Sequence, residues 1–138
     1  KGRYTVFSAL YTQVLKMPKR SKWAKRQLVD FLVLCYEDKI SPHSIKGSYA
    51  GAFGYGQFIP SSFVSYSVDG NNDGKRKPYD WEDVFASIAN YLIKNGYPTS
   101  EYNKDKVYKS IYAYNHADNY VKAVLALTGE IKKSIDKK

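Results

Sequence analysis

A glycine-rich stretch at residues 46–62 carries the side chains best suited to bind a ligand. Its glycines at 47, 51, 54 and 56 are too many for a regular helix, so its backbone is expected to take unusual angles or to lie close to another surface. Ser48, Tyr55 and Gln57 offer a hydroxyl, an aromatic ring and an amide, which can hydrogen-bond to and stack on a sugar chain. A purely structural connector is the alternative, and composition alone favours neither.

A second motif places oxygen donors at alternate positions of a loop. Asp69, Asn71 and Asp73 are followed by a glycine and by the backbone carbonyl of Lys75, which is the opening of an EF-hand calcium loop. The twelfth position holds Asp80 instead of the usual Glu, and the basic residues at 75–77 weaken cation binding. The pattern predicts a loose structural site for Ca²⁺ or Na⁺. A metal-free loop of Asx turns uses the same residues and stays open as an alternative.

The remaining reactive residue types point to structural roles. Cys35 lies in the apolar run Phe31-Leu-Val-Leu-Cys35 and is predicted to be a buried free thiol, because no second cysteine is present for a disulfide. The two histidines stand far apart, so a surface or helix-end role is expected for each. The glutamates are expected to be surface charges or helix caps. The histidines are His43 and His116, and the glutamates are Glu37, Glu82, Glu101 and Glu130.

The N-terminal third has the periodicity of two helices. Apolar residues at Val6, Leu10 and Val14 predict a first helix that stops at Met17-Pro18. Ser21 is a candidate cap for a second helix. The inner face of this second helix is predicted to carry Trp23, Leu28, Phe31, Leu32 and Cys35, with Lys22, Lys25 and Arg26 towards solvent.

Helical patterns also dominate the rest of the chain. Pro60-Ser-Ser opens a short helix, and residues 81–95 form a stronger one that stops at Gly96, with Val84, Phe85, Ile88, Leu92 and Ile93 inward. A segment near 107–114 leads into a last helix containing Val121, Val124, Leu125 and Ile131. The predicted fold is mainly α, with six or seven helices in one domain over residues 1–138 and with function carried by loops.

Composition limits the choice of partner. The chain has 138 residues, is 43% hydrophobic and has 22 Lys and Arg against 13 Asp and Glu, a net charge of +9 that favours a polyanion such as nucleic acid, an anionic membrane or a wall polymer. The chain contains 14 Tyr residues, and this number weakly favours a carbohydrate ligand. No apolar run reaches the length of a membrane span and no signal core follows Lys1. A signal or lipid anchor before Lys1 remains compatible with the sequence.

The order of residues at 46–62, Lys-Gly-Ser-Tyr-Ala-Gly-Ala-Phe-Gly-Tyr-Gly-Gln-Phe-Ile-Pro-Ser-Ser, resembles the motif of the membrane-bound B type of lytic murein transglycosylases. The likeness continues through Ala89-Asn90-Tyr91 and Tyr114-Asn115-His116 and extends from Gly2 to the final helix. It implies a lysozyme-like domain in the bacterial cell envelope, periplasmic or membrane-anchored, that binds peptidoglycan glycan strands. The groove residues that it implies are Ser48, Gln57, Tyr91, Tyr114, Asn115 and Tyr120. In these enzymes a similar acidic loop closes through an acid at the position of Asp83, so the resemblance favours Asp83 over Asp80 as a metal ligand.

The resemblance also implies a reaction that needs no cofactor. These enzymes cleave the bond between MurNAc and GlcNAc without water, using one Glu as acid and then as base, and leave a 1,6-anhydro end. The segment that carries this Glu falls before Lys1 in the family, so no catalytic residue is assigned within the chain. Two hypotheses follow: a transglycosylase whose acid lies upstream, or a peptidoglycan-binding module without catalysis. A nucleic-acid binder ranks third, because the basic residues are dispersed and no nucleic-acid motif is present.

Overall fold

The structure is a computed structural model that describes residues 2–137, and it is mainly helical. The chain divides into two compact units, which we call the N-terminal unit (residues 2–88) and the C-terminal unit (residues 89–137). Helix α4 (Trp81–Lys94) begins in the first unit and ends in the second. Whether the chain behaves as the single domain expected from its length stays a prediction. Among the described residues, no helix is both long and apolar enough to cross a membrane.

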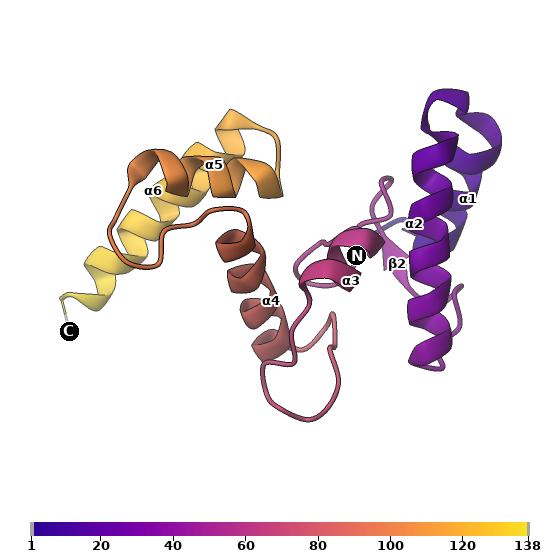
Figure 1. Cartoon of the computed structure of the whole chain (residues 1–138), viewed down its shortest axis with the longest axis horizontal. Helices are drawn as coiled ribbons and strands as arrows, with labels where there is room; N and C mark the ends of the chain where they lie inside the picture. The colour runs from indigo at the N-terminus through magenta and orange to yellow at the C-terminus, as the bar shows by residue number, and fades with distance from the viewer. Residues whose placement is uncertain (1, 138) are drawn as a thin grey trace. The chain divides into compact units, whose positions relative to one another are not determined.

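Two helices packed side by side form the largest part of the N-terminal unit (Figure 1). Helix α1 (Val6–Lys16) starts where the Thr5 hydroxyl accepts the Ser8 amide at 3.1 Å. Helix α2 (Pro18–Glu37) starts at Pro18, whose fixed φ and missing N–H suit the first helical position. The prediction that Ser21 caps α2 is therefore wrong. Its hydroxyl instead donates to the Val14 carbonyl at 2.9 Å and so joins the two helices.

The buried face of α2 differs in part from the predicted one. Phe31 and Cys35 are buried as expected, whereas Leu32 is 38% exposed and Trp23 is only half-buried, beneath the Arg20 guanidinium. The positions next to the core are instead Ala24, Gln27, Phe31, Leu34 and Cys35. A buried polar residue is acceptable at Gln27 because its carboxamide bonds to the Ser61 hydroxyl and amide at 2.9 and 3.0 Å.

The glycine-rich stretch is tied to this helical pair by short backbone pairing. Strand β1 (Tyr4–Thr5) pairs antiparallel with β2 (Lys46–Gly47), and isolated bridges then join Gly47 to Phe53 and Phe53 to Phe58. The Phe53 ring lies 6.0 Å from that of Phe31 on α2 and 5.3 Å from that of Phe63 on helix α3 (Pro60–Tyr66). The Phe53 ring therefore anchors the glycine-rich stretch to the aromatic residues of α2 and α3.

The C-terminal unit is built from the end of α4, helix α5 (Lys104–Tyr114) and helix α6 (Asp118–Ile135). Val107, Ile111 and Val121 form its core, with Leu92 of α4 packed against them. Gly96 follows α4 with φ +90°, as a glycine C-terminal stop requires. Two residues predicted to face inward on α4 do not: Phe85 and Ile93 are 64% and 50% exposed.

Candidate functional site

The first half of the glycine-rich stretch is a tight turn organised by Ser48. The Ser48 carbonyl accepts the Gly51 amide at 2.9 Å, and its hydroxyl oxygen accepts the Ala52 amide at 3.1 Å. The Ser48 amide donates to the Ala52 carbonyl at 2.8 Å, whereas its hydroxyl acts in this turn as an acceptor and keeps a hydrogen that can donate. Ser48, a predicted saccharide ligand, is thus also a structural element of its own loop.

The second half of the stretch presents Gln57 on the surface. Gln57 has φ +51°, which is uncommon for a residue with a side chain, and its Nε2 donates to the Gly54 carbonyl at 2.8 Å. Gly54 itself has φ +73°, and a Cβ there would lie 2.5 Å from the Pro78 carbonyl oxygen. A strained polar residue that is exposed and held by close backbone contacts is a candidate for ligand binding.

Tyr55 lies between these two residues and joins a cluster of aromatic rings. Its ring stacks on Trp81 at 4.3 Å with an interplanar angle of 18°, and it meets Tyr79 edge-on at 5.6 Å. Trp81 also stacks on Phe85 at 5.4 Å. The expected role of Tyr55 as a sugar-stacking residue stays a prediction, and the structure gives its ring a second role as an anchor. The partner rings were not among the residues predicted from the sequence.

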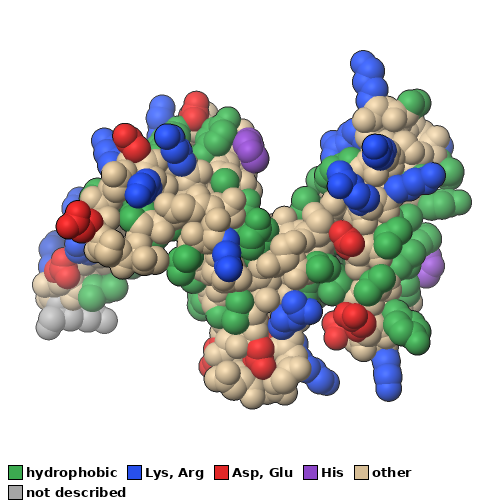
Figure 2. Space-filling view, viewed as in Figure 1, with side chains coloured by type: hydrophobic (Ala, Val, Ile, Leu, Met, Phe, Trp, Pro, Cys, Tyr) green, Lys and Arg blue, Asp and Glu red, His purple; other side chains and the backbone are tan. Residues whose placement is uncertain are grey.

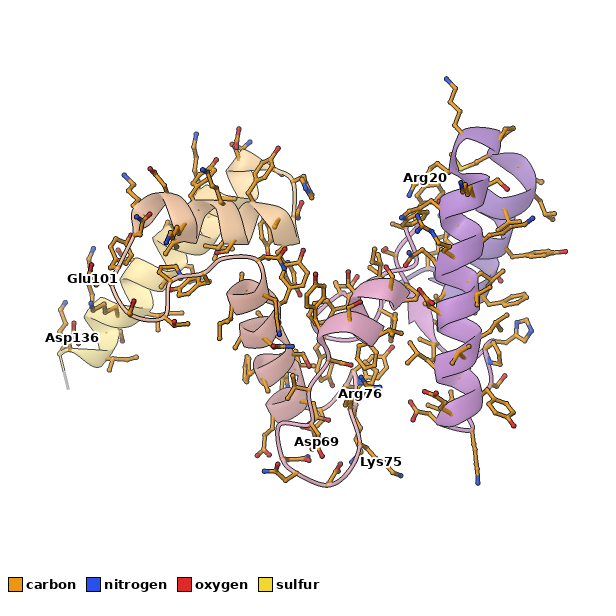
Figure 3. All side chains as sticks on the ribbon, viewed as in Figure 1. Arg20, Asp69, Lys75, Arg76, Glu101 and Asp136 are labelled. Carbon is orange, nitrogen blue, oxygen red and sulfur yellow. The ribbon has the colours of Figure 1, made fainter. Side chains whose placement is uncertain are left out.

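The loop after α3, where Figure 3 labels Asp69 and Lys75, is held by hydrogen bonds from its own backbone amides to its acidic and amide side chains. The Asp69 carboxylate accepts the amides of Asp73 and Gly74 at 3.1 and 2.8 Å, and the Asn71 oxygen accepts that of Asp73 at 3.1 Å. Asp73 in turn accepts the amide of Lys75 at 3.0 Å. The side chains that would hold a cation therefore also form the Asx turns of the alternative interpretation.

Asp83 and Asp80 have different roles at the end of this loop. Asp83 is 1% exposed, and its two carboxylate oxygens accept the amides of Gly70 at 2.8 Å and Lys77 at 2.7 Å. Asp80 instead accepts the amides of Glu82 and Asp83 at 3.0 and 3.3 Å and caps the start of α4. The loop thus closes through Asp83, the position that the resemblance favours.

Lys77 pairs with one of the acidic side chains of this loop. Its ammonium group forms an ion pair with the free oxygen of the Asp73 carboxylate, and this contact lowers the pKa of Asp73 and raises that of Lys77. Within residues 2–137, no three His, Cys, Asp or Glu side chains are gathered closely enough to hold a metal ion. The donor types of the loop fit calcium, and the Asp73 carboxylate is already paired with Lys77.

The predicted ligands of the C-terminal unit gather at the ends of its helices. Tyr91 on α4 donates from its hydroxyl to the Ala113 carbonyl at 2.7 Å, and its ring meets that of Tyr114 edge-on at 5.0 Å. Asn115 follows as the exposed C-cap of α5, and its carbonyl accepts the Ala117 amide at 2.7 Å. Tyr120 is 36% exposed at the start of α6. These four residues combine aromatic faces with an exposed amide, a surface suited to a sugar.

Tyr114 gives this set a measurable pH signature. Burial raises the pKa of its phenol well above the ordinary value, and the neighbouring hydroxyls of Tyr120 and Tyr91 raise it further. Above about pH 10 the unfolded chain loses this proton while the folded chain keeps it, so the stability of the fold should fall as the pH rises. Thermal unfolding by circular dichroism at pH 8 and 11 measures this loss.

Tyr114→Phe should reduce the fall in melting temperature between these two pH values, because phenylalanine has no proton to lose. Tyr112→Phe, on the same helix, is the matched control and should keep most of the fall. Equal pH dependence in the wild type and in Tyr114→Phe would contradict the role of this phenol.

The other reactive residues have structural neighbours. Cys35 is buried and free, and burial followed by the nearby Asp38 charge raises its pKa. His43 packs edge-on against Phe7 and His116 against Tyr112. Glu130 pairs with Lys133 at 2.8 Å. These observations agree with the surface and core roles predicted for them.

A cavity of about 800 Å³ lies in the N-terminal unit, and Lys75 and Asp80 of the acidic loop contribute to its lining. Phe31, Phe53 and Phe63 contribute to its lining, together with Pro78 and Tyr79. Ser48, Tyr55 and Gln57 do not line it. We therefore place the candidate site at the exposed turn rather than in this cavity.

Comparison with known sequences identifies relatives for most of the chain. The sequence profile of the transglycosylase SLT domain matches residues 1–107. Membrane-bound lytic murein transglycosylase B of Escherichia coli K12 is 38% identical over 96 residues, which cover 70% of this chain and 27% of that protein. The chain thus spans about a quarter of the length of that relative.

Solved structures share the fold. The soluble lytic transglycosylase SltB1 of Pseudomonas aeruginosa matches 98% of this chain and 65% of its own, with a TM-score of 0.88 and 27% identity. SltB3 of the same organism, in complex with NAG-NAM-pentapeptide, matches 72% of this chain and 27% of its own, with a TM-score of 0.66 and 34% identity. Slt35 of Escherichia coli, in complex with calcium, matches 96% and 61%, with a TM-score of 0.88 and 24% identity.

The predicted mainly helical, lysozyme-like fold is confirmed by these matches. The charge distribution is also as expected, since Figure 2 shows Lys and Arg side chains spread over both units rather than gathered in one patch on the face in view. The profile match over most of the sequence and the 38% identical relative show that the chain belongs to the transglycosylase SLT domain family.

Proposed function

We propose that the chain is the strand-binding part of a peptidoglycan lytic transglycosylase. The observation that carries the proposal is the exposed Gln57, which is held in a left-handed conformation by the Gly54 turn. Residues held in uncommon backbone conformations cluster at ligand-binding sites. Family membership supports the same function, and the NAG-NAM-pentapeptide bound to SltB3 indicates the class of ligand.

The proposed reaction cleaves the β-1,4 bond between MurNAc and GlcNAc without water. A Glu gives its proton to the glycosidic oxygen as the bond from the MurNAc anomeric carbon to that oxygen breaks. The MurNAc 6-hydroxyl then attacks the same carbon and returns its proton to the carboxylate. The product has a 1,6-anhydro end, no water has been added, and the Glu is protonated again. Tyr114 and Asn115 are proposed to hold the sugar beside the breaking bond.

We propose that the acid is a Glu upstream of Lys1. Several carboxylates of the chain serve the fold: Asp83 closes the loop, Asp80 caps α4, and Glu130 pairs with Lys133. Sequencing upstream of Lys1 tests this assignment. A Gly-x-Glu-Ser/Thr segment there supports the enzyme, and a non-acidic residue at the Glu position supports a module that only binds peptidoglycan.

Asn115→Ala in the full-length gene product should reduce the release of anhydro-muropeptides from purified murein at least about tenfold, a loss of about 1.4 kcal/mol in transition-state binding. The fold should stay intact, because Asn115 is exposed and its bonds to Ile111 and Ala117 are made by backbone atoms. Chromatography of the muropeptides and circular dichroism measure the two effects.

His116→Ala is the matched control, since His116 is the exposed neighbour and packs only at the edge of Tyr112. It should release anhydro-muropeptides at close to the wild-type rate. Unchanged release by Asn115→Ala would remove Asn115 from the reaction.

We also propose that the loop at residues 69–83 is a weak structural site for Ca²⁺ or Na⁺. Its ligands would be Asp69, Asn71, Asp73, the Lys75 carbonyl and Asp83, and the cation would add only rigidity. The calcium complex of Slt35 supports this proposal, and the Lys77 ion pair with Asp73 explains why binding should be weak.

Lys77→Met should therefore enlarge the rise in melting temperature that millimolar Ca²⁺ produces over EDTA, because a ligand that binds only the folded state stabilises it more when it binds more tightly. Asp73→Ala should abolish the rise, since it removes a ligand. Differential scanning calorimetry measures both. A Lys77→Met protein that responds to Ca²⁺ no more than the wild type would show that Lys77 does not compete.

The proposed partner is the glycan strand of peptidoglycan, and the proposed location is the bacterial cell envelope, where that polymer is found. The net charge of +9 suits this partner, because opposite charge on a wall strand speeds encounter even where stacking sets the fit. The membrane-bound relative supports the location.

A further inference from the structure

Four aromatic side chains of the N-terminal unit lie in contact with one another at its surface. The Tyr55 ring stacks on Trp81, Trp81 stacks on Phe85, and Tyr79 meets Tyr55 edge-on. We call these four residues the aromatic cluster, and each of them is between 48% and 64% exposed. A single exposed apolar side chain is ordinary, but a contiguous group of them marks a surface that binds a ligand or a partner.

The backbone presents the aromatic cluster from two fixed places. The Tyr55 amide donates to the Pro78 carbonyl at 2.9 Å, which joins the glycine-rich stretch to the loop before α4. Trp81 begins α4, at the end of the helix that the Asp80 carboxylate caps, and Phe85 follows one turn later on the same helix. Rings held in this way lose little conformational entropy when a ligand stacks on them.

The chemistry of the aromatic cluster favours a sugar chain over an apolar protein partner. The cluster consists of rings alone, and the two tyrosines add hydroxyl groups that can hydrogen-bond, a combination suited to the apolar faces and the hydroxyl groups of a saccharide. The cluster also contains Tyr55, the predicted sugar-stacking residue, which lies two positions before Gln57. It is therefore continuous with the candidate site at the glycine-rich stretch.

Exposed aliphatic side chains of the same unit belong to another element. Val29, Leu32 and Val33 are exposed on α2, which contributes no ring to the aromatic cluster. A purely apolar partner would find its surface there, whereas the cluster at the start of α4 offers flat rings. This contrast supports a saccharide as the occupant of the cluster.

We propose that Trp81 and Phe85 are further sugar-binding residues, and that the aromatic cluster extends the glycan site from the glycine-rich stretch onto the start of α4. The ligand is the glycan strand of peptidoglycan, so this inference rests on the proposed function. The exposed parts of the two rings make the contact, with a sugar lying across each of them. A strand held at several of its sugars binds more tightly than one held at the turn alone.

The fluorescence of Trp81 tests the contact directly, because the chain has only two tryptophans. In a Trp23→Phe protein the tryptophan emission comes from Trp81 alone. Peptide-free glycan strands prepared from murein should reduce the quenching of this emission by acrylamide about twofold or more, since a sugar on the ring keeps the quencher away. Trp81→Phe is the matched control: it leaves only Trp23, beneath the Arg20 guanidinium, and the quenching of that emission should not change.

Calorimetry with the same strands measures what the aromatic cluster adds to the affinity. Trp81→Ala should weaken binding about three- to tenfold, the size of one lost aromatic contact, and Phe85→Ala should weaken it as well. Trp81→Tyr should keep most of the affinity, because it retains a ring. Tyr36→Ala is the control, since Tyr36 is highly exposed on α2 outside the cluster, and it should bind like the wild type. Equal weakening by Tyr36→Ala and Trp81→Ala would show that exposed rings attract the strands without a defined site and would overturn the proposal.

The two measurements separate this inference from the proposed function. Strands that bind the wild type but leave the acrylamide quenching of Trp81 unchanged overturn the sugar contact of Trp81, while the proposed function stands. A wild-type chain that binds no strands contradicts the proposed function, and the sugar site of the aromatic cluster with it. Binding that shields Trp81 from acrylamide supports both.

Discussion

Replacing Phe31 with alanine should lower the free energy of unfolding of the N-terminal unit by about 3–5 kcal/mol, the usual cost of truncating a buried phenylalanine. Phe31 is completely buried, and its ring packs against Phe53 of the glycine-rich stretch. Phe53 in turn packs on Phe63 of α3. The cavity left by the substitution therefore removes the support for the stretch as well as contacts within the helical pair.

Urea unfolding followed by tryptophan fluorescence measures this loss, since Trp23 and Trp81 both lie in the N-terminal unit. Leu32→Ala is the control, because Leu32 is the next residue of α2 but is 38% exposed. It should change the free energy of unfolding by no more than about 1 kcal/mol. Equal losses in the two variants would mean that the inner face of α2 is the one predicted from the sequence rather than the one observed.

The helices could be predicted from the sequence because each has a local signal. Apolar periodicity indicates α1, and Met17-Pro18 marks its end. Pro60 marks the start of α3, and Gly96 marks the end of α4. The buried faces were harder to predict, since they depend on which neighbour covers each side. Ala24 and Gln27 are buried on α2 because other segments pack there. A periodic pattern of large apolar residues does not predict the burial of a small or a polar residue. Phe85 is exposed for the opposite reason: in the part of the chain that the structure describes, nothing covers it sufficiently.

The unusual backbone of the glycine-rich stretch was predicted from its four glycines, and φ +73° at Gly54 bears this out. The left-handed conformation of Gln57, with φ +51°, was not predicted. The stacking of Tyr55 on Trp81 joins residues that are 26 positions apart in the sequence, so no local sequence pattern predicts this contact. The Lys77 pair with Asp73 could have been found, because both lie in one short loop and carry opposite charges. The sequence interpretation used the basic residues only as a general repulsion of cations.

Replacing Asp83 with alanine should cost the N-terminal unit about 3 kcal/mol of its free energy of unfolding. The two carboxylate oxygens accept the amides of Gly70 and Lys77, from the two ends of the acidic loop. Each hydrogen bond to a charged group contributes about 1.5–3 kcal/mol, and its loss leaves a donor without a partner in a poorly hydrated place. Asp83→Asn should recover only part of the loss, because the amide nitrogen of asparagine faces one backbone N–H as a second donor.

Unfolding in the presence of EDTA separates this hydrogen-bonding role from any role as a cation ligand. The loss should appear at full size without Ca²⁺, because both acceptor bonds are made by the protein alone. Asp80→Ala is the control: Asp80 caps α4 with similar bonds but is not buried, so its loss should cost only about 1 kcal/mol. A loss for Asp83→Ala that appears only when Ca²⁺ is present would make Asp83 a metal ligand first. In that case the loop that supports Pro78, and with it the turn of Gln57, would depend on the cation rather than on the backbone amides.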